Sequence, residues 1–400
     1  MAETMYALPE NIEAFRGEIM DTDAHEQIPI NRWEQYFGPV VKDIADAIGR
    51  STLRGATPYE KDDTPITPES VWTIKKGDAP GCFDFKRRLE VMDYIGVRRQ
   101  LMFPGSYGLL AVAFYYRADD PTLFKSITGD RRGYARKTLD AYNNWCVDAL
   151  IGEDRLRPAI ITLQDTVEDL IADTARLLKK GIRAFWIPCA KPLAGLSPAH
   201  PDLDPFWAMI AEANAAVVSH VGADEGFLAT MKWRDAPAFD GWKGGEEFAL
   251  DPWTLSSVHR PIENFLSVMI MGGVFDRHPT LRFGACESTG HWIGPLGQNL
   301  DIWHEHSRMF QQNANSTYTL PMKPSDYIKR NVRISVFPVE PVDAYIDQFG
   351  MTDVYCFGTD FPHPEGGRDP MGDLSKKLER HGPEVLRKFF VENAKWIMPD

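Results

Sequence analysis

Residues that can bind a metal ion or move a proton occur where several short apolar segments of the sequence end. Asp23 and His25 lie two residues apart after Ile-Met at positions 19–20, and in a strand their side chains would share one face. His220 ends the segment AAVVSH, Glu287 follows RFGAC, and Asp360 follows CFGT. Carboxylates and imidazoles together are ligands that suit Zn²⁺, Mn²⁺ or Fe²⁺.

Each of these residues taken alone also has a structural explanation. A histidine that ends a buried strand is more often a hydrogen-bonded core residue, and an aspartate in GTD is often a helix cap. Their joint occurrence carries more weight, because burying several ionisable groups together is unfavourable unless a divalent cation balances them. Asp21 shares the face of Asp23 but lies deeper, so a structural or supporting role is expected, and Glu26 should point away from the interior.

The elements that would position these residues alternate along the chain. The segments expected to be strands are EIMDTDAH, VRRQLMFPG, RLRPAIITL, IRAFWIPCA, AAVVSHVGA, LRFGACES, VRISVFPV and VYCFGTDFP. Between them lie amphipathic helical windows, such as the one expected to start after a cap at Thr166 and end at Gly181, and one capped by Asp204. Eight strands alternating with helices predict an α/β fold, a (β/α)₈ TIM barrel whose catalytic groups lie at the strand C-terminal ends.

We expect a single barrel domain over residues 1–400 with long insertions after strands 1 and 5, at residues 26–90 and 223–260. Both insertions follow strand ends, so they should lie on the catalytic face, where long loops commonly line a site or an oligomer interface. Trp233, Trp242 and Trp253 argue against disorder in the second insertion.

Composition narrows the class of protein. The net charge is −13 and no long basic run is present, so nucleic-acid binding is not expected. The five cysteines are scattered without a CxxC pair, which indicates neither a disulfide framework nor a thiolate zinc site and favours the reducing cytoplasm. The first residues lack the pattern of a signal peptide, and the longest apolar window, FLSVMIMGGVF, is too short to cross a membrane.

The stretches DTDAHEQIP, VRRQLMFPG, LSPAHPDLDPFWAMIAEANAAVVSHVG, GVFDRHPTLRFGACESTGHWIGPLGQNLD and VYCFGTDFPHPEGG together resemble a known family. It is the amidohydrolase-related group of metal-dependent (β/α)₈ enzymes, which includes aminocarboxymuconate-semialdehyde, γ-resorcylate and 5-carboxyvanillate decarboxylases. The resemblance covers most of the chain. It implies one divalent metal ion, Zn²⁺ or Mn²⁺, held by Asp23, His25, His220 and Asp360.

The sequence departs from this family at the end of the sixth strand. Well-studied decarboxylases of the family have a histidine there, whereas this chain has Glu287 in CESTGHW, as a related subgroup does. His291 follows four residues later. If a helix starts near Thr289, His291 would lie at its N-terminus and face the pocket; the alternative is an exposed helix residue.

Two reactions fit these residues. In the decarboxylase interpretation, the enzyme cleaves a C–C bond of a small aromatic or unsaturated carboxylic acid. The metal withdraws charge, Asp360 delivers the proton that replaces CO₂, and Glu287, His291 and His363 position the substrate. In the hydrolase interpretation, the metal activates water, and Asp360 or Glu287 is the general base that acts on an ester, lactone, amide or C–C bond next to a carbonyl.

The remaining expectations concern the substrate pocket and partners. His363, Trp292 and Phe103 are expected to bind the substrate, and loop aromatics at positions 33, 36 and 253 could complete a flat apolar wall, although such residues mostly fill satellite cores. A non-catalytic metal-binding barrel would require the loss of a ligand, and none is missing. The expected partners are a small-molecule substrate and a second copy of the chain in a homodimer.

Overall fold

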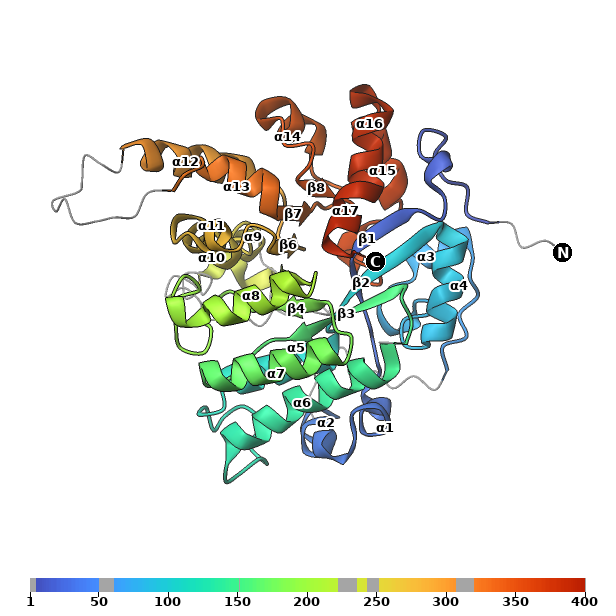
Figure 1. The fold of residues 1–400 in the computed structure, drawn as a ribbon. Coiled ribbons are helices and arrows are strands. Elements are labelled where there is room, and N and C mark those ends of the chain that lie inside the picture. Colours follow the sequence, from blue (N-terminus) through green and yellow to red (C-terminus); the bar gives the residue numbers. More distant parts are fainter. Residues whose placement is uncertain are drawn as a thin grey trace.

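The protein folds as a ring of eight parallel strands surrounded by helices (Figure 1). The computed structural model describes residues 5–49, 61–150, 152–221, 236–242, 252–306 and 320–399. The strands are β1 Ile19–His25, β2 Val97–Phe103, β3 Leu156–Ile161, β4 Ala184–Trp186, β5 Ala216–His220, β6 Arg282–Cys286, β7 Val332–Ser335 and β8 Tyr355–Cys356, and their order in the sheet is their order in the chain. The predicted TIM barrel is confirmed.

The barrel closes between β1 and the segment that follows β8. The backbone N–H of Asp360 donates to the carbonyl oxygen of Asp23 at 2.8 Å, and that of His25 donates to the carbonyl oxygen of Phe361 at 2.8 Å. Two predicted ligands at the N-terminal end of the chain are therefore held by backbone bonds against a third at the C-terminal end.

Several strands are shorter than the sequence pattern predicted. Regular pairing of the last strand ends at Cys356, although the apolar pattern continued to Pro362. Asp360 has a φ of 52°, outside the β region, and a proline has no N–H to donate to a ladder. Regular pairing thus ends before the functional side chains begin, and the segment that carries them keeps only separate backbone bonds to β1.

The helices form the outer layer (Figure 1). They are α1 Trp33–Phe37, α2 Lys42–Gly49, α3 Pro68–Thr73, α4 Phe85–Ile95, α5 Ser106–Tyr116, α6 Arg131–Leu150, α7 Val167–Lys179, α8 Asp204–Glu212, α9 Pro252–Leu255, α10 Arg260–Met271, α11 Val274–Arg277, α12 Ile293–His306, α13 Pro324–Asn331, α14 Val342–Phe349, α15 Pro370–Leu378, α16 Gly382–Arg387 and α17 Asn393–Ile397. A π-helical turn, Lys388–Glu392, joins the last two. Within the described ranges, no helix combines the length and apolarity that crossing a membrane would need.

Two helix starts test the sequence interpretation. The helix α7 begins as predicted, with the Thr166 hydroxyl accepting from the N–H of Asp169 at 3.1 Å. The helix α8 begins at Asp204 itself, so this residue is not the cap that was expected. Its carboxylate instead accepts from Arg277 Nε at 2.9 Å and lies 3.2 Å from His278 Nε2, which ties α8 to the end of α11.

The C-terminal helix closes the end of the barrel where the strands begin. The guanidinium of Arg333, near the start of β7, lies 4.3 Å from the ring of Trp396 in α17. Arg99, near the start of β2, donates to the carbonyl oxygen of Met398 at 2.9 Å. The opposite end, where the strands finish, is the end that carries the predicted ligands.

Between β1 and β2 lie the helices α1 to α4. The fully buried Arg88 of α4 anchors this segment, because its guanidinium donates to the carbonyl oxygens of His25 and Gly81, each at 2.6 Å, and lies 4.6 Å from the ring of Phe361. The predicted insertion after strand 5 falls largely outside the described residues, of which 236–242 and 252–260 belong to it.

The turn that leaves β2 packs closely on the residue after β1. A Cβ at Gly105 would lie 1.7 Å from the backbone carbonyl oxygen of Glu26, so Gly105→Ala must move one of two backbone segments next to His25. We predict that this substitution lowers the free energy of unfolding by about 1–3 kcal/mol, the range for overpacking. Equilibrium urea unfolding measures it. Gly152→Ala is the matched control, since a Cβ there meets nothing within 4 Å; an equal effect of both substitutions would contradict the prediction.

Candidate metal centre

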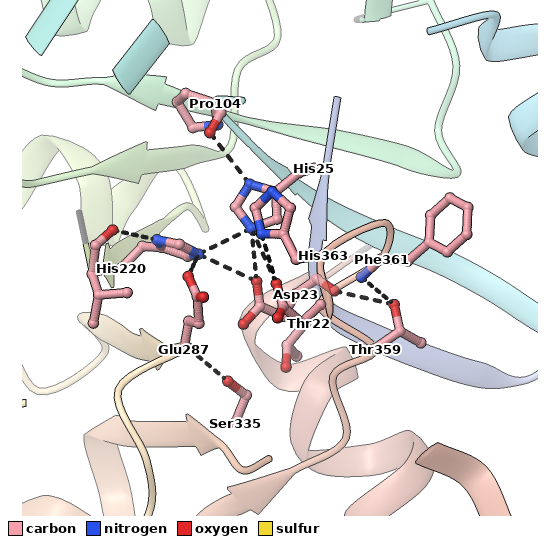
Figure 2. A network of polar contacts seen from close by, with 12 residues as sticks. Thr22, Asp23, His25, Pro104, His220, Glu287, Ser335, Thr359, Phe361 and His363 are labelled. Atoms are coloured by element: carbon pink, nitrogen blue, oxygen red, sulfur yellow. Dashed lines mark hydrogen bonds and ion pairs between the residues drawn. The ribbon is translucent and has the colours of Figure 1, made fainter. Parts of the chain in front are cut away.

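Asp23, His25 and His220, three of the four predicted ligands, converge at the C-terminal end of the barrel (Figure 2), and the fourth, Asp360, belongs to a second group of ligand atoms that shares His25. His25 Nε2 lies 3.1 Å from His220 Nε2, and Asp23 Oδ1 lies 3.5 Å from each of these nitrogens. Asp360 Oδ1 lies 3.6 Å from His25 Nε2. All four side chains are buried, and they come from β1, β5 and the segment after β8.

The spacing of these atoms fits a divalent cation. Ligand atoms about 2.1 Å from an ion lie about 3.0 Å apart at a right angle and about 3.4 Å apart at the tetrahedral angle. The three separations among Asp23, His25 and His220, and the one between Asp360 and His25, range from 3.1 to 3.6 Å. Within the described part of the chain, Asp23 Oδ1 is also buried without accepting a hydrogen bond. The residues present therefore fit the expected divalent metal cofactor.

The carboxylates and imidazoles of the cluster shift one another's pKa values. Burial raises the pKa of Asp23, but its contacts with His220 and His25 outweigh burial and hold the pKa below its usual value. Burial lowers the pKa of His220, but the charges of Glu287 and Asp23 outweigh it and raise the pKa. Ionised carboxylates thus surround the imidazoles and favour a positive charge between them.

A shell of hydrogen bonds fixes the first strand beneath the cluster. Asp21 accepts from Gln100 Nε2 at 2.8 Å and from the hydroxyl of Thr359 at 2.6 Å, and burial raises its pKa to about 6. Glu26 accepts from the N–H groups of Gly105 at 2.7 Å and Ile28 at 3.0 Å, and burial raises its pKa to about 7. Both carboxylates bind backbone or amide donors at the strand ends.

Glu287 reaches the same cluster from the end of β6. Its Oε2 lies 2.8 Å from His220 Nε2, and its backbone N–H donates to the Ser335 hydroxyl at 3.1 Å (Figure 2). The loop that follows is held by Glu340, whose carboxylate accepts from the N–H of Gly290 at 2.7 Å. Sequence reasoning missed Glu340, because it lies five residues beyond β7 in no recognisable pattern.

His363 lies against the cluster rather than apart from it. Its ring stacks on that of His25 with centroids 4.0 Å apart, and its Nδ1 lies 3.0 Å from Asp360 Oδ1. Gln27 Nε2 lies 2.9 Å from the other ring nitrogen, and Ser106 Oγ donates to Gln27 Oε1 at 3.0 Å. Burial, followed by the charges of neighbouring cationic groups, holds the pKa of His363 well below its usual range.

Gln27 and Ser106 were also missed by sequence reasoning. Gln27 continues the alternation of positions 23 and 25 by one more step, which is a signal that could have identified it. Ser106 offers no comparable signal, because it opens the helix after β2 and meets Gln27 only when the barrel closes.

The other predicted site residues lie at different depths. Phe103 ends β2 fully buried, with its ring centroid 4.5 Å from that of His220. Trp292 is buried and donates from its indole nitrogen to the carbonyl oxygen of Ser288 at 3.0 Å. His291 is exposed, and its Nδ1 lies 2.8 Å from the Thr289 hydroxyl.

The helix expected near Thr289 begins later, at Ile293, so His291 precedes the helix instead of forming its first turn. The reason is local, since Thr289 has a φ of 57°, which is not helical. The ring of His291 lies 4.7 Å from that of the buried His259, which burial gives a pKa lowered to about 4.

The loop aromatics pack mainly with one another. Trp33 is 1% exposed and lies 5.2 Å from the ring of Tyr107. Tyr36 lies 6.3 Å from the ring of Trp145. The structure thus places these two in an aromatic cluster on α1, α5 and α6. Trp253 lies half-buried in α9.

Comparison with solved structures shows that the whole chain resembles several known proteins. An amidohydrolase from Mycobacterium avium subsp. paratuberculosis K-10 superimposes with a TM-score of 0.68 at 20% identity over 96% of this chain and 98% of that chain. The 5-carboxyvanillate decarboxylase of Novosphingobium aromaticivorans DSM 12444, complexed with manganese and 4-hydroxy-3-methoxy-5-nitrobenzoic acid, gives 0.60 at 16% over 99% of both chains. The dihydroxybenzoic acid decarboxylase of Polaromonas sp. JS666, with manganese and 2-nitroresorcinol, gives 0.57 at 15% over 95% and 96%.

At these low sequence identities, the TM-scores show that the three proteins share the fold of this chain. Comparison with curated protein sequences gives no match. The sequence model of the amidohydrolase family, however, matches residues 77–396, which is most of the chain and includes His220, Glu287 and Asp360. The protein is therefore an enzyme of the amidohydrolase family.

Proposed function

We propose that the protein is a metal-dependent decarboxylase that acts on a small aromatic or unsaturated carboxylic acid. The observation that carries the proposal is a buried cluster in which the ligand atoms of Asp23, His25 and His220 lie 3.1 to 3.5 Å apart and Asp360 lies 3.6 Å from His25. Two structural neighbours with the same fold are decarboxylases of benzoic acid derivatives. The cytoplasmic location and the homodimer expected from the sequence stay predictions.

The four residues would hold one Mn²⁺ or Zn²⁺ ion. Bound there, the ion would supply Lewis acidity that draws off charge while the C–C bond breaks. Carboxylate ligands suit Mn²⁺, and both decarboxylase structures contain manganese, so Mn²⁺ is the ion we favour.

Protein side chains would transfer the proton that replaces CO₂ on the substrate. When the bond to the carboxylate breaks, its electron pair stays on the substrate carbon, CO₂ leaves, and one proton must be added to that carbon. Asp360 would take up a proton from solvent and deliver it to that carbon, and His363, whose Nδ1 lies 3.0 Å from Asp360 Oδ1, would orient this carboxyl group. Phe103, Trp292 and His291 would contact the substrate, and their different depths suggest that the ring enters past the exposed His291.

One observation favours a second reaction, metal-dependent hydrolysis. Glu287 places a carboxylate oxygen 2.8 Å from His220 Nε2, one of the proposed ligand atoms. In this alternative, Glu287 or Asp360 accepts the proton of that water, and the substrate is an ester, lactone, amide or C–C bond next to a carbonyl.

Removal of a ligand tests the metal centre. His220→Ala and Asp360→Ala should each abolish metal binding and turnover together, because loss of a ligand weakens binding by more than the roughly 10- to 100-fold that loss of an outer hydrogen bond costs. Elemental analysis gives the metal content, and CO₂ release gives turnover. His278→Ala, whose histidine pairs with Asp204 far from the cluster, is the control and should retain both. Stoichiometric metal in both ligand variants would refute the ligand assignment.

Isotope labelling separates the two reactions. A panel of aromatic and unsaturated acids incubated in D₂O should release CO₂ and gain one deuterium at the carbon that carried the carboxylate. Hydrolysis would instead place oxygen-18 from labelled water in a product, with no CO₂. Mass spectrometry of the products reads both outcomes, and oxygen-18 incorporation without CO₂ release would replace the decarboxylase proposal with the alternative.

A substitution at Glu287 measures its part in turnover. Glu287→Gln keeps the size of the side chain but removes its charge, so we predict that kcat falls at least about 100-fold, as for other residues that handle charge in a reaction. Steady-state kinetics on the substrate found in the panel measures the change. Near wild-type turnover would show that Glu287 is structural.

A further inference from the structure

Glu287 adopts a backbone conformation that needs a compensating interaction. Its φ is 48°, a left-handed value that non-glycine residues adopt uncommonly and at a cost. The backbone is held there by the bond from its N–H to Ser335 Oγ, and the side chain is only 12% exposed. This conformation turns the carboxylate into the barrel toward His220.

The tautomers of the two imidazoles follow from their backbone contacts. His220 Nδ1 lies 2.6 Å from the carbonyl oxygen of Val221, and His25 Nδ1 lies 3.3 Å from that of Pro104. A carbonyl oxygen only accepts hydrogen bonds, so each Nδ1 carries a hydrogen. In the neutral rings the lone pairs are then on Nε2, and the two Nε2 atoms face each other at 3.1 Å.

Glu287 Oε2 lies 2.8 Å from His220 Nε2, the nitrogen that carries the lone pair whenever this ring is neutral, as it must be to bind a metal ion. It also approaches the rest of the cluster, because a ligand atom of Glu287 lies within 4.8 Å of ligand atoms of His25 and Asp360. Acceptors at such distances repel unless a positive charge lies between them, which is a proton on the imidazole in the apoprotein and would be the metal ion in the loaded protein. A separation of 2.8 Å is close to the spacing of about 3.0 Å for two ligands at a right angle around one ion.

We propose that Glu287 is a fifth protein ligand of the metal ion, which gives a centre of three carboxylates and two imidazoles. The proposal rests on the metal-dependent function proposed above but not on which reaction is catalysed. It assigns a ligand at the position where the family resemblance implies a histidine. An oxygen-rich centre of high coordination number suits Mn²⁺ better than the four-coordinate geometry typical of Zn²⁺.

Metal titration of the apoprotein tests this proposal without any substrate. Wild-type protein, Glu287→Gln and Glu287→His are titrated with Mn²⁺, whose free concentration is read by electron paramagnetic resonance, and Zn²⁺ is added in competition. Glu287→Gln should weaken Mn²⁺ binding at least about 10-fold, the low end of what metal-site substitutions cost. Glu287→His should shift the preference from Mn²⁺ toward Zn²⁺ by a similar factor.

Glu365→Gln is the matched control. Glu365 is a half-buried carboxylate whose charge interacts with that of Glu287, yet within the described residues it is not among the groups of converging ligand atoms. Its substitution tests the effect of charge alone and should change Mn²⁺ affinity less than about threefold. An equal loss in Glu365→Gln and Glu287→Gln would overturn the proposal, because general charge would then explain both.

The outcomes separate the two proposals. If the wild type binds no divalent metal, the proposed function fails. If it binds Mn²⁺ and Glu287→Gln binds it within twofold, with an unchanged spectrum of the bound ion, only the fifth ligand fails. Circular dichroism of each apoprotein checks folding. Should Glu287→Gln not fold, Glu287→Asp takes its place, because the shorter side chain keeps the charge but moves the carboxylate oxygen away from the metal ion. Unchanged Mn²⁺ binding by this variant would likewise overturn the proposal.

Discussion

Buried acceptor atoms that face one another at the C-terminal end of the barrel repel, and the surrounding structure has to hold them in place. The ligand atoms of His220, Asp23 and Asp360 lie 3.1, 3.5 and 3.6 Å from His25 Nε2, distances at which lone pairs and ionised carboxylates repel unless a cation lies among them. Without a cation, such a group would be relieved by protonation or by movement of the side chains. The surrounding structure must therefore hold each side chain in place before any ion arrives.

That support comes from backbone and buried polar contacts rather than from the ligands themselves. The seam between β1 and the segment after β8 joins Asp23, His25 and Asp360 through main-chain bonds. Arg88, from a helix outside the barrel, reaches the carbonyl oxygen of His25 at 2.6 Å and lies over Phe361, so the segment between β1 and β2 is tied to the same strand end. A buried polar network in which the donors and acceptors are satisfied fixes one arrangement, and movement of one member disturbs the others.

Glu287 distinguishes this centre from a centre with histidine at the same place. A carboxylate brings negative charge as well as a ligand atom, and here it is aimed by a left-handed backbone that Ser335 and the Glu340-bound loop maintain. Conformational strain at a functional group persists only where neighbouring contacts over-determine it. The same loop carries His291 at the surface, so a residue beside the candidate metal centre and an exposed histidine belong to one short segment.

The sequence alone determined the fold and led to the proposed ligand set. Apolar segments alternating with amphipathic helices gave eight strands in the correct order, and α7 began at the predicted cap, because hydrophobic periodicity and capping are local properties. The spacing of Asp23 and His25 placed them on one face for the same reason. The resemblance to the amidohydrolase family added His220 and Asp360 as expected ligands. The match to the sequence model of this family confirms that the chain belongs to it.

Only the tertiary structure decided which atoms face one another. Asp204 became a partner of Arg277 rather than a cap, and the helix expected near Thr289 began at Ile293, because loop conformation is set by partners distant in the chain. Gln27 with Ser106, and Glu340 with Gly290, are contacts across 79 and 50 positions. Such pairs leave no periodic signal, since closure of the barrel, and not the local sequence, brings their donors and acceptors to hydrogen-bonding distance.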